Sequence, residues 1–310
     1  MLNENIPSEF RRFAEFPGAK MPHRRRQVDS HGSQIAVYEW GDETASPILL
    51  AHGGFDFAAT YCQFAPLLAN GGYRVIAFDQ RGHGNSDHTA LYSWAADLRD
   101  TLAVANSIGP EPIPLIGHSK GGSLLTQFAQ AYPHRVSHLI NLDGLPSRRR
   151  HPDISDHERS RLREKELGNW LDHRLACAEL KRSAGGLEEL ARRRGRMNPR
   201  LSHEWLCFLV TQGAQRDDDG WRWKIDASMR FGGFGPWNPT WELQRLPGLS
   251  MPLLGLLATV SEEMGWETKE KDLLPYLPPR AEIVSIEGAG HFIHIEFPDE
   301  IAKRVLDFLN

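Results

Sequence analysis

The sequence is poor in cysteine and has no long apolar run. Its three cysteines are an odd number scattered over 310 residues, so free thiols in a reducing compartment are expected rather than a disulfide framework. No stretch approaches the ~18 consecutive apolar residues that cross a bilayer, and residues 1–26 lack the continuous apolar segment of a secretory signal. We therefore expect a cytoplasmic protein with no membrane partner.

An excess of charge of one sign is also missing. The formal net charge is −4 at pH 7, which gives no reason to expect nucleic acid as a partner. Two basic clusters, 148–150 and 192–194, have acidic residues nearby and are expected to be solvated helix faces. No cysteine stands at a metal-ligand spacing. We expect neither a metal nor an organic cofactor.

The chain does contain a regular alternation of apolar strands and amphipathic helices. A β-hairpin is expected over residues 27–40. Buried strands are then predicted at 47–51, 73–78, 113–116, 138–142, 252–257 and 281–286. Helices are predicted at about 58–69, 93–107, 122–129 and 298–309. This interleaving predicts an α/β protein with a mostly parallel sheet that helices cover on both faces.

The composition changes after Leu145. Residues 147–245 are rich in arginine, glutamate and tryptophan and are expected to be mainly helical, with one extended piece at 220–225. The strand and helix alternation then resumes. We interpret 1–146 and 246–310 as two parts of one core and 147–245 as a helical lid inserted between them.

The most informative motif is Gly-His-Ser-Lys-Gly at residues 117–121, directly after the strand predicted at 113–116. A serine between glycines, at a sharp turn from strand to helix, is typical of a nucleophile elbow. The turn accepts only small flanking residues and lifts the hydroxyl above the end of the sheet. Ser119 is therefore the candidate nucleophile.

A serine hydroxyl needs an adjacent base, and His291 is the candidate. It follows the last predicted strand within Gly288-Ala289-Gly290-His291-Phe292, where small residues allow the loop to approach the elbow. Chemistry in open α/β sheets gathers at this carboxyl end of the strands. His294 is expected to start the final helix. Structural roles are expected for His52, His83 and His118.

A carboxylate must orient the base, and the sequence offers more than one. Asp143 ends the strand that follows the nucleophile's helix, next to Gly144. Glu262 and Glu263 follow the strand predicted at 252–257 and are expected to face solvent. We favour Asp143, with Glu262 as the alternative.

Acyl transfer also needs donors for the developing oxyanion. One should be the backbone N–H of Lys120, the residue after the nucleophile. The other should come from the loop 51–55, with Gly54 as the first choice and Phe55 as the alternative. The Lys120 side chain is expected to point away from the site.

These motifs resemble the α/β-hydrolase superfamily over nearly the whole chain. The resemblance rests on His52-Gly53, the run from Asp79 to Ser86, the Ser119 elbow, and Gly288 to His291 followed by Phe297-Pro298. It implies an eight-stranded sheet and a helical cap at 147–245, as in the lidded esterase and lactonase branch. It also implies that Asp79 and Arg81 support the elbow without a catalytic role.

One position departs from the usual pattern of that superfamily. Most relatives carry the acid about nine residues past the proline that opens the penultimate strand, and counting from Pro252 this slot holds Ser261. A minority place the acid after the strand that follows the nucleophile's helix, which is where Asp143 stands. A serine nucleophile argues against the chemistry of the dehalogenase and epoxide-hydrolase relatives.

The resulting prediction is a serine hydrolase that cleaves a carboxylic ester or lactone through an acyl-enzyme. A largely apolar small-molecule substrate is expected, with Phe55 and Phe292 among its contacts. Two alternatives stay open: hydrolysis of a carbon–carbon bond in a ring-cleavage product, and a ligand receptor without turnover. A homodimer also stays open.

Overall fold

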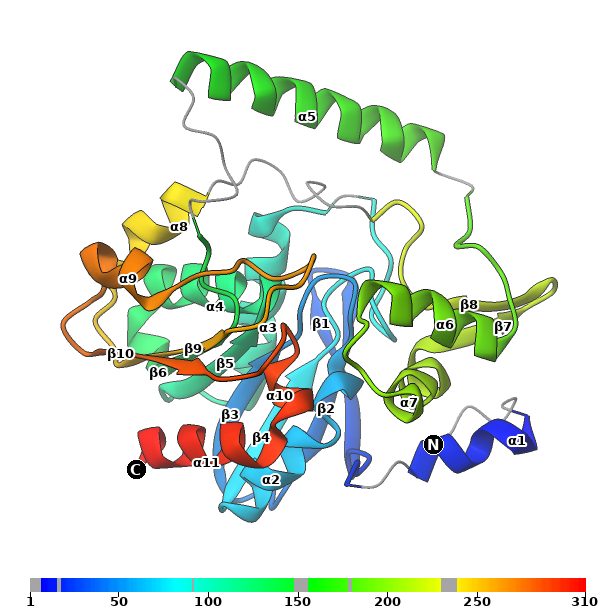
Figure 1. The fold of residues 1–310 in the computed structure, drawn as a ribbon, viewed down its shortest axis with the longest axis horizontal. Coiled ribbons are helices and arrows are strands. Elements are labelled where there is room, and N and C mark those ends of the chain that lie inside the picture. The colour runs from blue at the N-terminus through cyan, green and yellow to red at the C-terminus, as the bar shows by residue number, and fades with distance from the viewer. Residues whose placement is uncertain (1–6, 16–17, 91, 148–155, 178–179, 230–238) are drawn as a thin grey trace.

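The structure, a computed structural model, describes residues 7–310 except 16–17, 91, 148–155, 178–179 and 230–238. No helix in these ranges is both long enough and apolar enough to span a membrane. The three cysteines are buried and none of them forms a disulfide. Figure 1 shows a central sheet with helices packed around it.

Eight strands form the main sheet in the order β1-β2-β4-β3-β5-β6-β9-β10. The hairpin β1–β2 and the pair β2–β4 are antiparallel, and the other pairs are parallel. The mostly parallel eight-stranded sheet predicted from the sequence is thereby confirmed. Its strands are β1 (Arg24–Ser30), β2 (Ser33–Trp40), β3 (Ser46–Ala51), β4 (Tyr73–Phe78), β5 (Ile113–His118), β6 (Val136–Leu142), β9 (Leu253–Ala258) and β10 (Ala281–Ile286).

Two apolar layers bury the faces of this sheet. In β3, Ile48 and Leu50 belong to one buried cluster, and Leu49 and Ala51 belong to the other. Successive side chains of a strand point to opposite faces, so a continuously apolar strand feeds both layers. Helices α2 and α11 pack together on the first face, and α3 and α4 cover the second.

The helices outside the segment between β6 and β9 are mostly short. They are α1 (Ser8–Arg11), α2 (Phe64–Asn70), α3 (Trp94–Ile108), α4 (Lys120–Ala131), α9 (Glu270–Leu273), α10 (Ile293–Glu296) and α11 (Pro298–Leu309).

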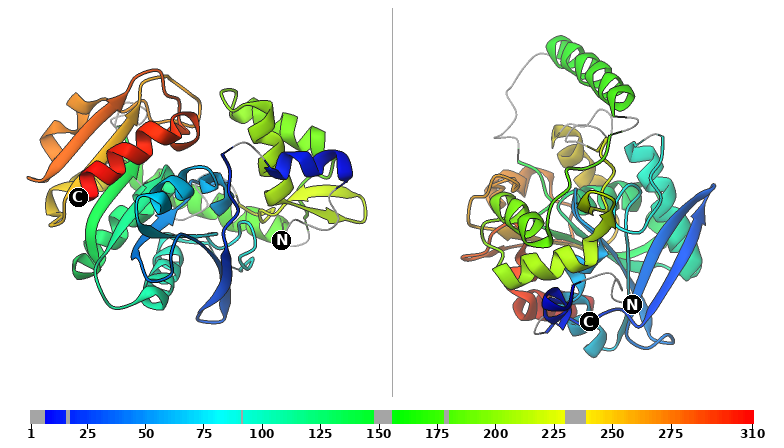
Figure 2. Two further views of the ribbon diagram at one scale, coloured as in Figure 1. Left: turned by 90° about the horizontal axis from the view of Figure 1, so that it is seen from below. Right: turned by 90° about the vertical axis from the view of Figure 1, so that its right-hand side faces the viewer.

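The chain between β6 and β9 is mainly helical, as its composition predicts. It contains α5 (Asp156–Ala176), α6 (Leu187–Met197), α7 (His203–Gly213), the hairpin β7 (Ala214–Asp217) and β8 (Gly220–Trp223), and α8 (Pro239–Arg245). Helices α6 and α7 lie beside the hairpin, whereas α5 stands away from the sheet at the top of Figure 1 and in the right-hand view of Figure 2. Trp170 of α5 is buried in a small cluster with Tyr92 and Met229.

Two helices differ from the sequence-based expectation, and a proline explains each difference. The helix expected at 58–69 is a 3-10 turn, Ala58–Tyr61, followed by α2. Pro66 has no N–H for the carbonyl of Cys62, and that carbonyl instead accepts a bond of 2.7 Å from Lys20. His294 lies in α10 and not at the start of the final helix, which begins at Pro298. The residue that precedes a proline rarely adopts the helical conformation, so the chain cannot continue as one helix from α10 into α11.

Candidate active site

Ser119 stands on a sharp turn between β5 and α4. Its backbone has φ 52° and ψ −120°, a left-handed φ that residues with a side chain rarely adopt. A Cβ on Gly121 would lie 2.1 Å from the carbonyl oxygen of Ala51, and one on Gly117 would lie 2.4 Å from that of Gly121. Both glycines of the motif are therefore required by close backbone packing, as the elbow interpretation expects.

The imidazole of His291 contacts the carboxylate of Asp143. His291 Nδ1 lies 2.7 Å from Asp143 Oδ2, and the two side chains are only 2% and 5% exposed. The second oxygen of Asp143 accepts the backbone N–H of Ala258 at 3.0 Å. These contacts fix the carboxylate at the end of β6, so it accepts the Nδ1 proton and leaves Nε2 as the basic nitrogen.

Glu262, the alternative acid, contacts the same loop in a different way. Its carboxylate accepts the backbone N–H of His291, whereas the ring is bound by Asp143. Glu262 thus holds the histidine loop in place, a role that the sequence analysis missed. The contact joins residues 29 positions apart, and no local pattern marks it. Glu263 is exposed.

A cavity of about 170 Å³ opens at the elbow. The predicted residues Ser119, His291, Gly54, Lys120, Phe55 and Phe292 all line it. The rest of the wall is formed by residues for which the sequence predicted no contact with a substrate: Gly53, Asp56, Trp94, His118, Ser123, Met264 and Trp266. The structure therefore brings the nucleophile, base and oxyanion candidates to one cavity, with aromatic rings around them.

The loop after β3 distinguishes the two oxyanion candidates. The N–H of Phe55 donates to His83 Nε2 at 3.2 Å, so it is already used. The N–H of Gly54 has no hydrogen-bond acceptor among the residues that the structure describes. His83 Nδ1 lies 3.0 Å from the carbonyl of Arg81, and burial lowers the pKa of His83 well below its usual value. A neutral His83 that donates from Nδ1 can accept at Nε2, which favours Gly54 as the oxyanion donor.

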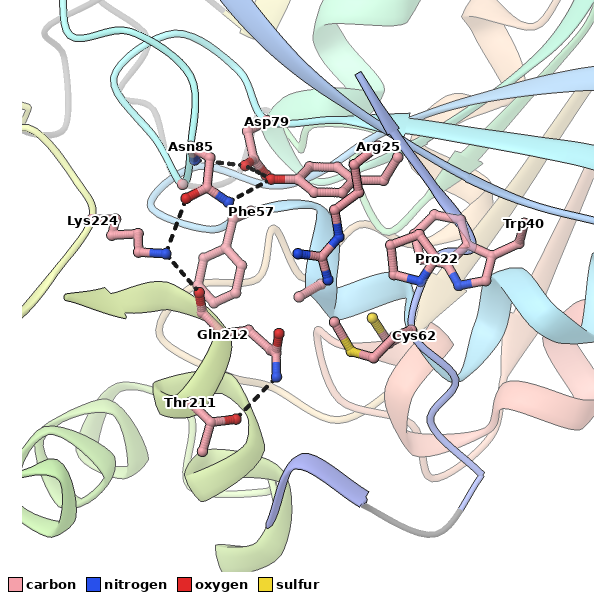
Figure 3. A pocket seen from close by; sticks show the side chains of 14 residues that line it. Pro22, Arg25, Trp40, Phe57, Cys62, Asp79, Asn85, Thr211, Gln212 and Lys224 are labelled. Atoms are coloured by element: carbon pink, nitrogen blue, oxygen red, sulfur yellow. Dashed lines mark hydrogen bonds between the residues drawn. The ribbon is translucent and has the colours of Figure 1, made fainter. Parts of the chain in front are cut away.

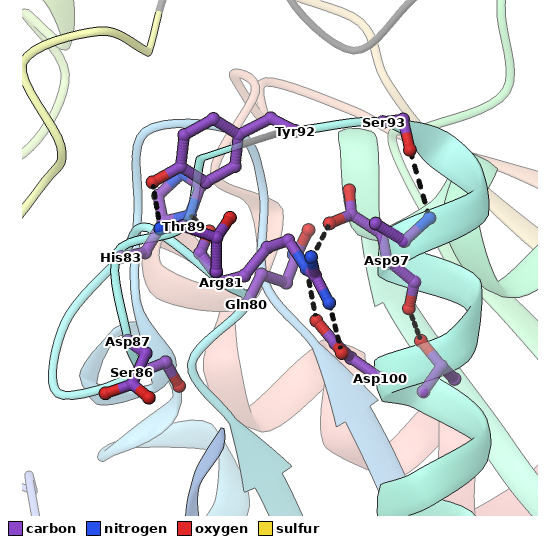
Figure 4. Close-up of polar contacts among 12 residues, drawn as sticks. Gln80, Arg81, His83, Ser86, Asp87, Thr89, Tyr92, Ser93, Asp97 and Asp100 are labelled. Atoms are coloured by element: carbon purple, nitrogen blue, oxygen red, sulfur yellow. Dashed lines mark hydrogen bonds and ion pairs between the residues drawn. The ribbon is translucent and has the colours of Figure 1, made fainter. Parts of the chain in front are cut away.

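The side chain of Lys120 is held in a buried polar network, and Figure 4 shows the part of it that Gln80, Arg81, Asp97 and Asp100 form. Lys120 Nζ donates to Asp97 at 2.6 Å and to Gln80 at 2.5 Å. Arg81 binds Asp100 through two bonds of 2.6 Å. These contacts hold the ammonium group against α3. Lys120 also begins α4, where the first N–H groups of a helix lack carbonyl partners within that helix.

Arg194 of α6 connects the segment between β6 and β9 to the loop after β3 that carries Gly54 and Phe55, here called the oxyanion loop. Its Nη1 donates to the carbonyl of Phe55 at 2.9 Å, and its Nη2 lies 3.2 Å from the carboxylate of Asp56. Burial raises the pKa of Asp56. Phe55 has φ 59°, so the guanidinium holds a strained turn from outside the sheet.

A second cavity, of about 260 Å³, lies behind the loop 79–86 and shares no lining residue with the cavity at Ser119. Figure 3 shows Lys224 bonded there to Asn85 at 3.0 Å. Asp79 accepts the backbone N–H groups of Ala58 and Asn85 and the hydroxyl of Tyr38. Its oxygens are thus occupied in holding the loop, the structural role that the resemblance implies for Asp79.

One group of side chains away from the elbow could hold a metal ion. Glu188 of α6 and His203 and Cys207 of α7 place their ligand atoms within 4.8 Å of one another. None of the three lines the cavity at Ser119. Their spacing in the sequence forms no metal-ligand pattern because Glu188 joins His203 and Cys207 only through the packing of two helices.

The fold, the elbow and the Asp143–His291 contact together define an α/β hydrolase. The family model described as the alpha/beta hydrolase family matches residues 48–304, so the chain belongs to that family.

Similar proteins agree with this assignment. A serine hydrolase-like protein of Danio rerio is 24% identical over 282 residues, which cover 87% of this chain and 83% of that protein. Epoxide hydrolase A of Mycobacterium tuberculosis is 23% identical over 314 residues, which cover 92% and 96%. A solved thioesterase domain from the curacin biosynthetic pathway is 25% identical with a TM-score of 0.79, covering 92% of this chain and 99% of that one. These names span several reactions, so they do not specify the reaction of this chain.

Proposed function

We propose that the protein is a serine hydrolase that cleaves a carboxylic ester or lactone through an acyl-enzyme. The observation that carries the proposal is the shared cavity of Ser119 and His291, with the imidazole oriented by Asp143 at 2.7 Å. A serine, a histidine and an aspartate that orients the histidine are the groups that acyl transfer needs. The segment between β6 and β9 is proposed to act as the lid.

The steps follow from the positions of these groups. Ser119 Oγ bonds to the carbonyl carbon while His291 Nε2 takes its proton, and the N–H groups of Gly54 and Lys120 stabilise the oxyanion. The carbon–oxygen bond to the leaving alcohol then breaks, and His291 returns the proton to that alcohol. Water attacks the acyl-enzyme with His291 again as the base. The acid is released as Ser119 recovers its proton.

Covalent labelling tests the proposal. Incubation with a fluorophosphonate should add one label, and peptide mass spectrometry should locate it on Ser119. Turnover of p-nitrophenyl acetate should be continuous in the native protein and reduced by several orders of magnitude in Ser119→Ala and in His291→Ala. A label on another serine, or an active Ser119→Ala, would contradict the assignment.

The same assay separates the alternatives kept from the sequence. A receptor without turnover would give at most one equivalent of p-nitrophenolate per protein molecule. A carbon–carbon hydrolase would also use Ser119 and His291, and it would hydrolyse a vinylogous diketone faster than a matched ester. Apolar and aromatic side chains around Ser119, including Phe55 and Phe292, support an ester with a largely apolar body.

A further inference from the structure

A larger cavity adjoins the one at Ser119. It has a volume of about 550 Å³ and shares Gly54, Phe55, Met264 and Phe292 with the smaller cavity. Ligand sites commonly measure ~300–1,000 Å³, so the larger cavity alone is of that size. A substrate whose reacting carbonyl lies at Ser119 would therefore extend one arm into this space.

The wall of the larger cavity is basic. Three arginines line it, Arg182, Arg193 and Arg194, and no acidic residue does so among those that the structure describes. The rest of the wall is mainly apolar, with Trp223, Ile225, Met229 and Met264. Such a surface suits an arm that carries a negative charge on an apolar chain.

The three arginines are not equivalent. Arg193 forms an ion pair with Glu189, and Arg194 is paired with Asp56. Among the described residues, Arg182 donates to backbone carbonyls alone: Nε donates to Ile225 at 3.3 Å, and Nη2 donates to Asp226 and Met229 at 2.9 Å each. Within the described residues no carboxylate lies within ion-pair distance of Arg182, and its Nη1 has no hydrogen-bond partner.

We propose that the larger cavity binds a carboxylate on the substrate, recognised by Arg182, so that the preferred substrates are esters with a free carboxylate on one arm. This inference rests on the proposed ester hydrolysis and names its substrate class. The carbonyls of Ile225, Asp226 and Met229 hold the guanidinium in place and leave Nη1 for the ligand. Nη1 keeps two N–H groups that can donate to a carboxylate, and the charge of the guanidinium strengthens such hydrogen bonds.

Paired substrates test the inference. Ethyl half-esters of succinate, glutarate and adipate place the charge on the acyl arm, and butyrate esters of ω-hydroxy acids place it on the alcohol arm. Each is compared with an uncharged ester of equal length by titrating the acid released. In at least one series kcat/KM should favour the charged member. Hydrogen bonds to charged groups contribute ~1.5–3 kcal/mol, which corresponds to about tenfold or more.

Variants assign the preference to Arg182. Arg182→Gln should remove it, whereas Arg182→Lys, which keeps the charge, should retain part of it. Loss of the carbonyl bonds could loosen the wall in both variants, but that would slow charged and uncharged esters alike and leave their ratio unchanged. Lys181→Gln removes a neighbouring charge from a largely exposed side chain and serves as the matched control.

The outcomes are distinguishable from failure of the proposed function. Equal rates for charged and uncharged esters in both series, or a preference that survives Arg182→Gln, would overturn the carboxylate site while leaving ester hydrolysis intact. Absence of any Ser119-dependent hydrolysis would instead overturn the proposed function.

Discussion

The two regions that line the site hold their functional side chains in different ways. At the edge of the sheet, Asp143 is fixed by the backbone N–H of Ala258 and His291 by Asp143, and both side chains are nearly sealed from solvent. Between β6 and β9, Arg182 is held by carbonyls of an irregular stretch beyond β8. In the first region the functional side chains are positioned by strand ends, and in the second region Arg182 is positioned by the backbone of loops.

This difference suggests a division of roles. Strand ends are rigid, so groups placed there keep the alignment that bond making requires. Loops vary more readily and commonly carry the contacts that select a substrate. We expect changes at the sheet edge to remove the reaction and changes between β6 and β9 to alter which ester is chosen. Four predictions test this comparison.

The largest effect should follow from Asp143→Asn. The variant keeps the volume of the side chain but favours the wrong tautomer of His291, and the corresponding change in a triad lowers kcat by about 10⁴-fold. Glu262→Gln should cost at most about tenfold, because an amide oxygen can still accept the N–H of His291. Both values come from kcat on an uncharged ester. Activity retained in Asp143→Asn but lost in Glu262→Gln would move the acid to the later loop.

These two acids also show what the sequence could and could not predict. Ser119 and Asp143 directly follow buried strands, and His291 follows β10 within a glycine-containing loop, so a local pattern marks each position. Parallel strands bring their carboxyl ends to one edge, so three separate local patterns predict that these side chains lie close together, as they do in the structure. Glu262 and Arg194 act through contacts between distant segments, and nothing in their neighbouring residues indicates the partner.

The prediction of helices and strands from the sequence has the same limit, because a local pattern does not indicate which distant surface a segment contacts. The central strands were predictable because apolar runs feed both layers of the core, and the hairpin was predictable from the turn between its two strands. The positions of α6 and α7 beside the site were not, since their apolar residues indicate burial without indicating which surface covers them.

The second prediction concerns the buried network behind Lys120. Asp100→Ala leaves the buried guanidinium of Arg81 without its main partner, and breaking a buried pair in this way costs about 3–5 kcal/mol of unfolding free energy. Urea denaturation measures the loss. The double variant Arg81→Met/Asp100→Leu should recover much of it because no charge is left unpaired. Asp307→Ala breaks the exposed pair with Lys303 and should change stability little.

The third prediction is a pH dependence of stability. Burial lowers the pKa of His294 to about 3, while an unfolded histidine has a pKa of ~6.5. Between pH values of about 3 and ~6.5 the unfolded state binds a proton that the folded state does not, so the free energy of unfolding falls as the pH drops below ~6.5. His294→Leu removes this group, so the free energy of unfolding that is lost between pH 8 and pH 5 should be smaller by about 2 kcal/mol than in the native protein.

Urea titrations at the two pH values give this difference directly. No hydrogen bond to either ring nitrogen of His294 is present within the described residues, so the leucine breaks none there. The exposed residue His134, replaced by leucine, is the control and should leave the pH dependence as in the native protein. An unchanged pH dependence in His294→Leu would mean that His294 does not stay neutral in the fold.

The smallest expected effect concerns Arg194, which connects α6 to the loop after β3. Arg194→Met removes the bonds to the Phe55 carbonyl and to Asp56, so the oxyanion loop loses its support from α6. Loss of a whole oxyanion donor costs about 10²–10³ in kcat, and a displaced donor should cost less, about tenfold. KM for an uncharged ester should change little. Arg192→Met, an exposed neighbour on the same helix, should change neither constant.

A second substitution, Asp56→Asn, tests whether the loss of kcat in Arg194→Met arises from displacement of the oxyanion loop. Arg194→Met leaves the buried carboxylate of Asp56 without its ion pair, and Asp56→Asn removes that charge. If the loop is displaced by the unpaired carboxylate, the double variant should recover part of kcat, which a double-mutant cycle measures. A raised KM with an unchanged kcat would instead place Arg194 among the substrate contacts. The support of the oxyanion loop would then belong to His83 and the sheet edge alone.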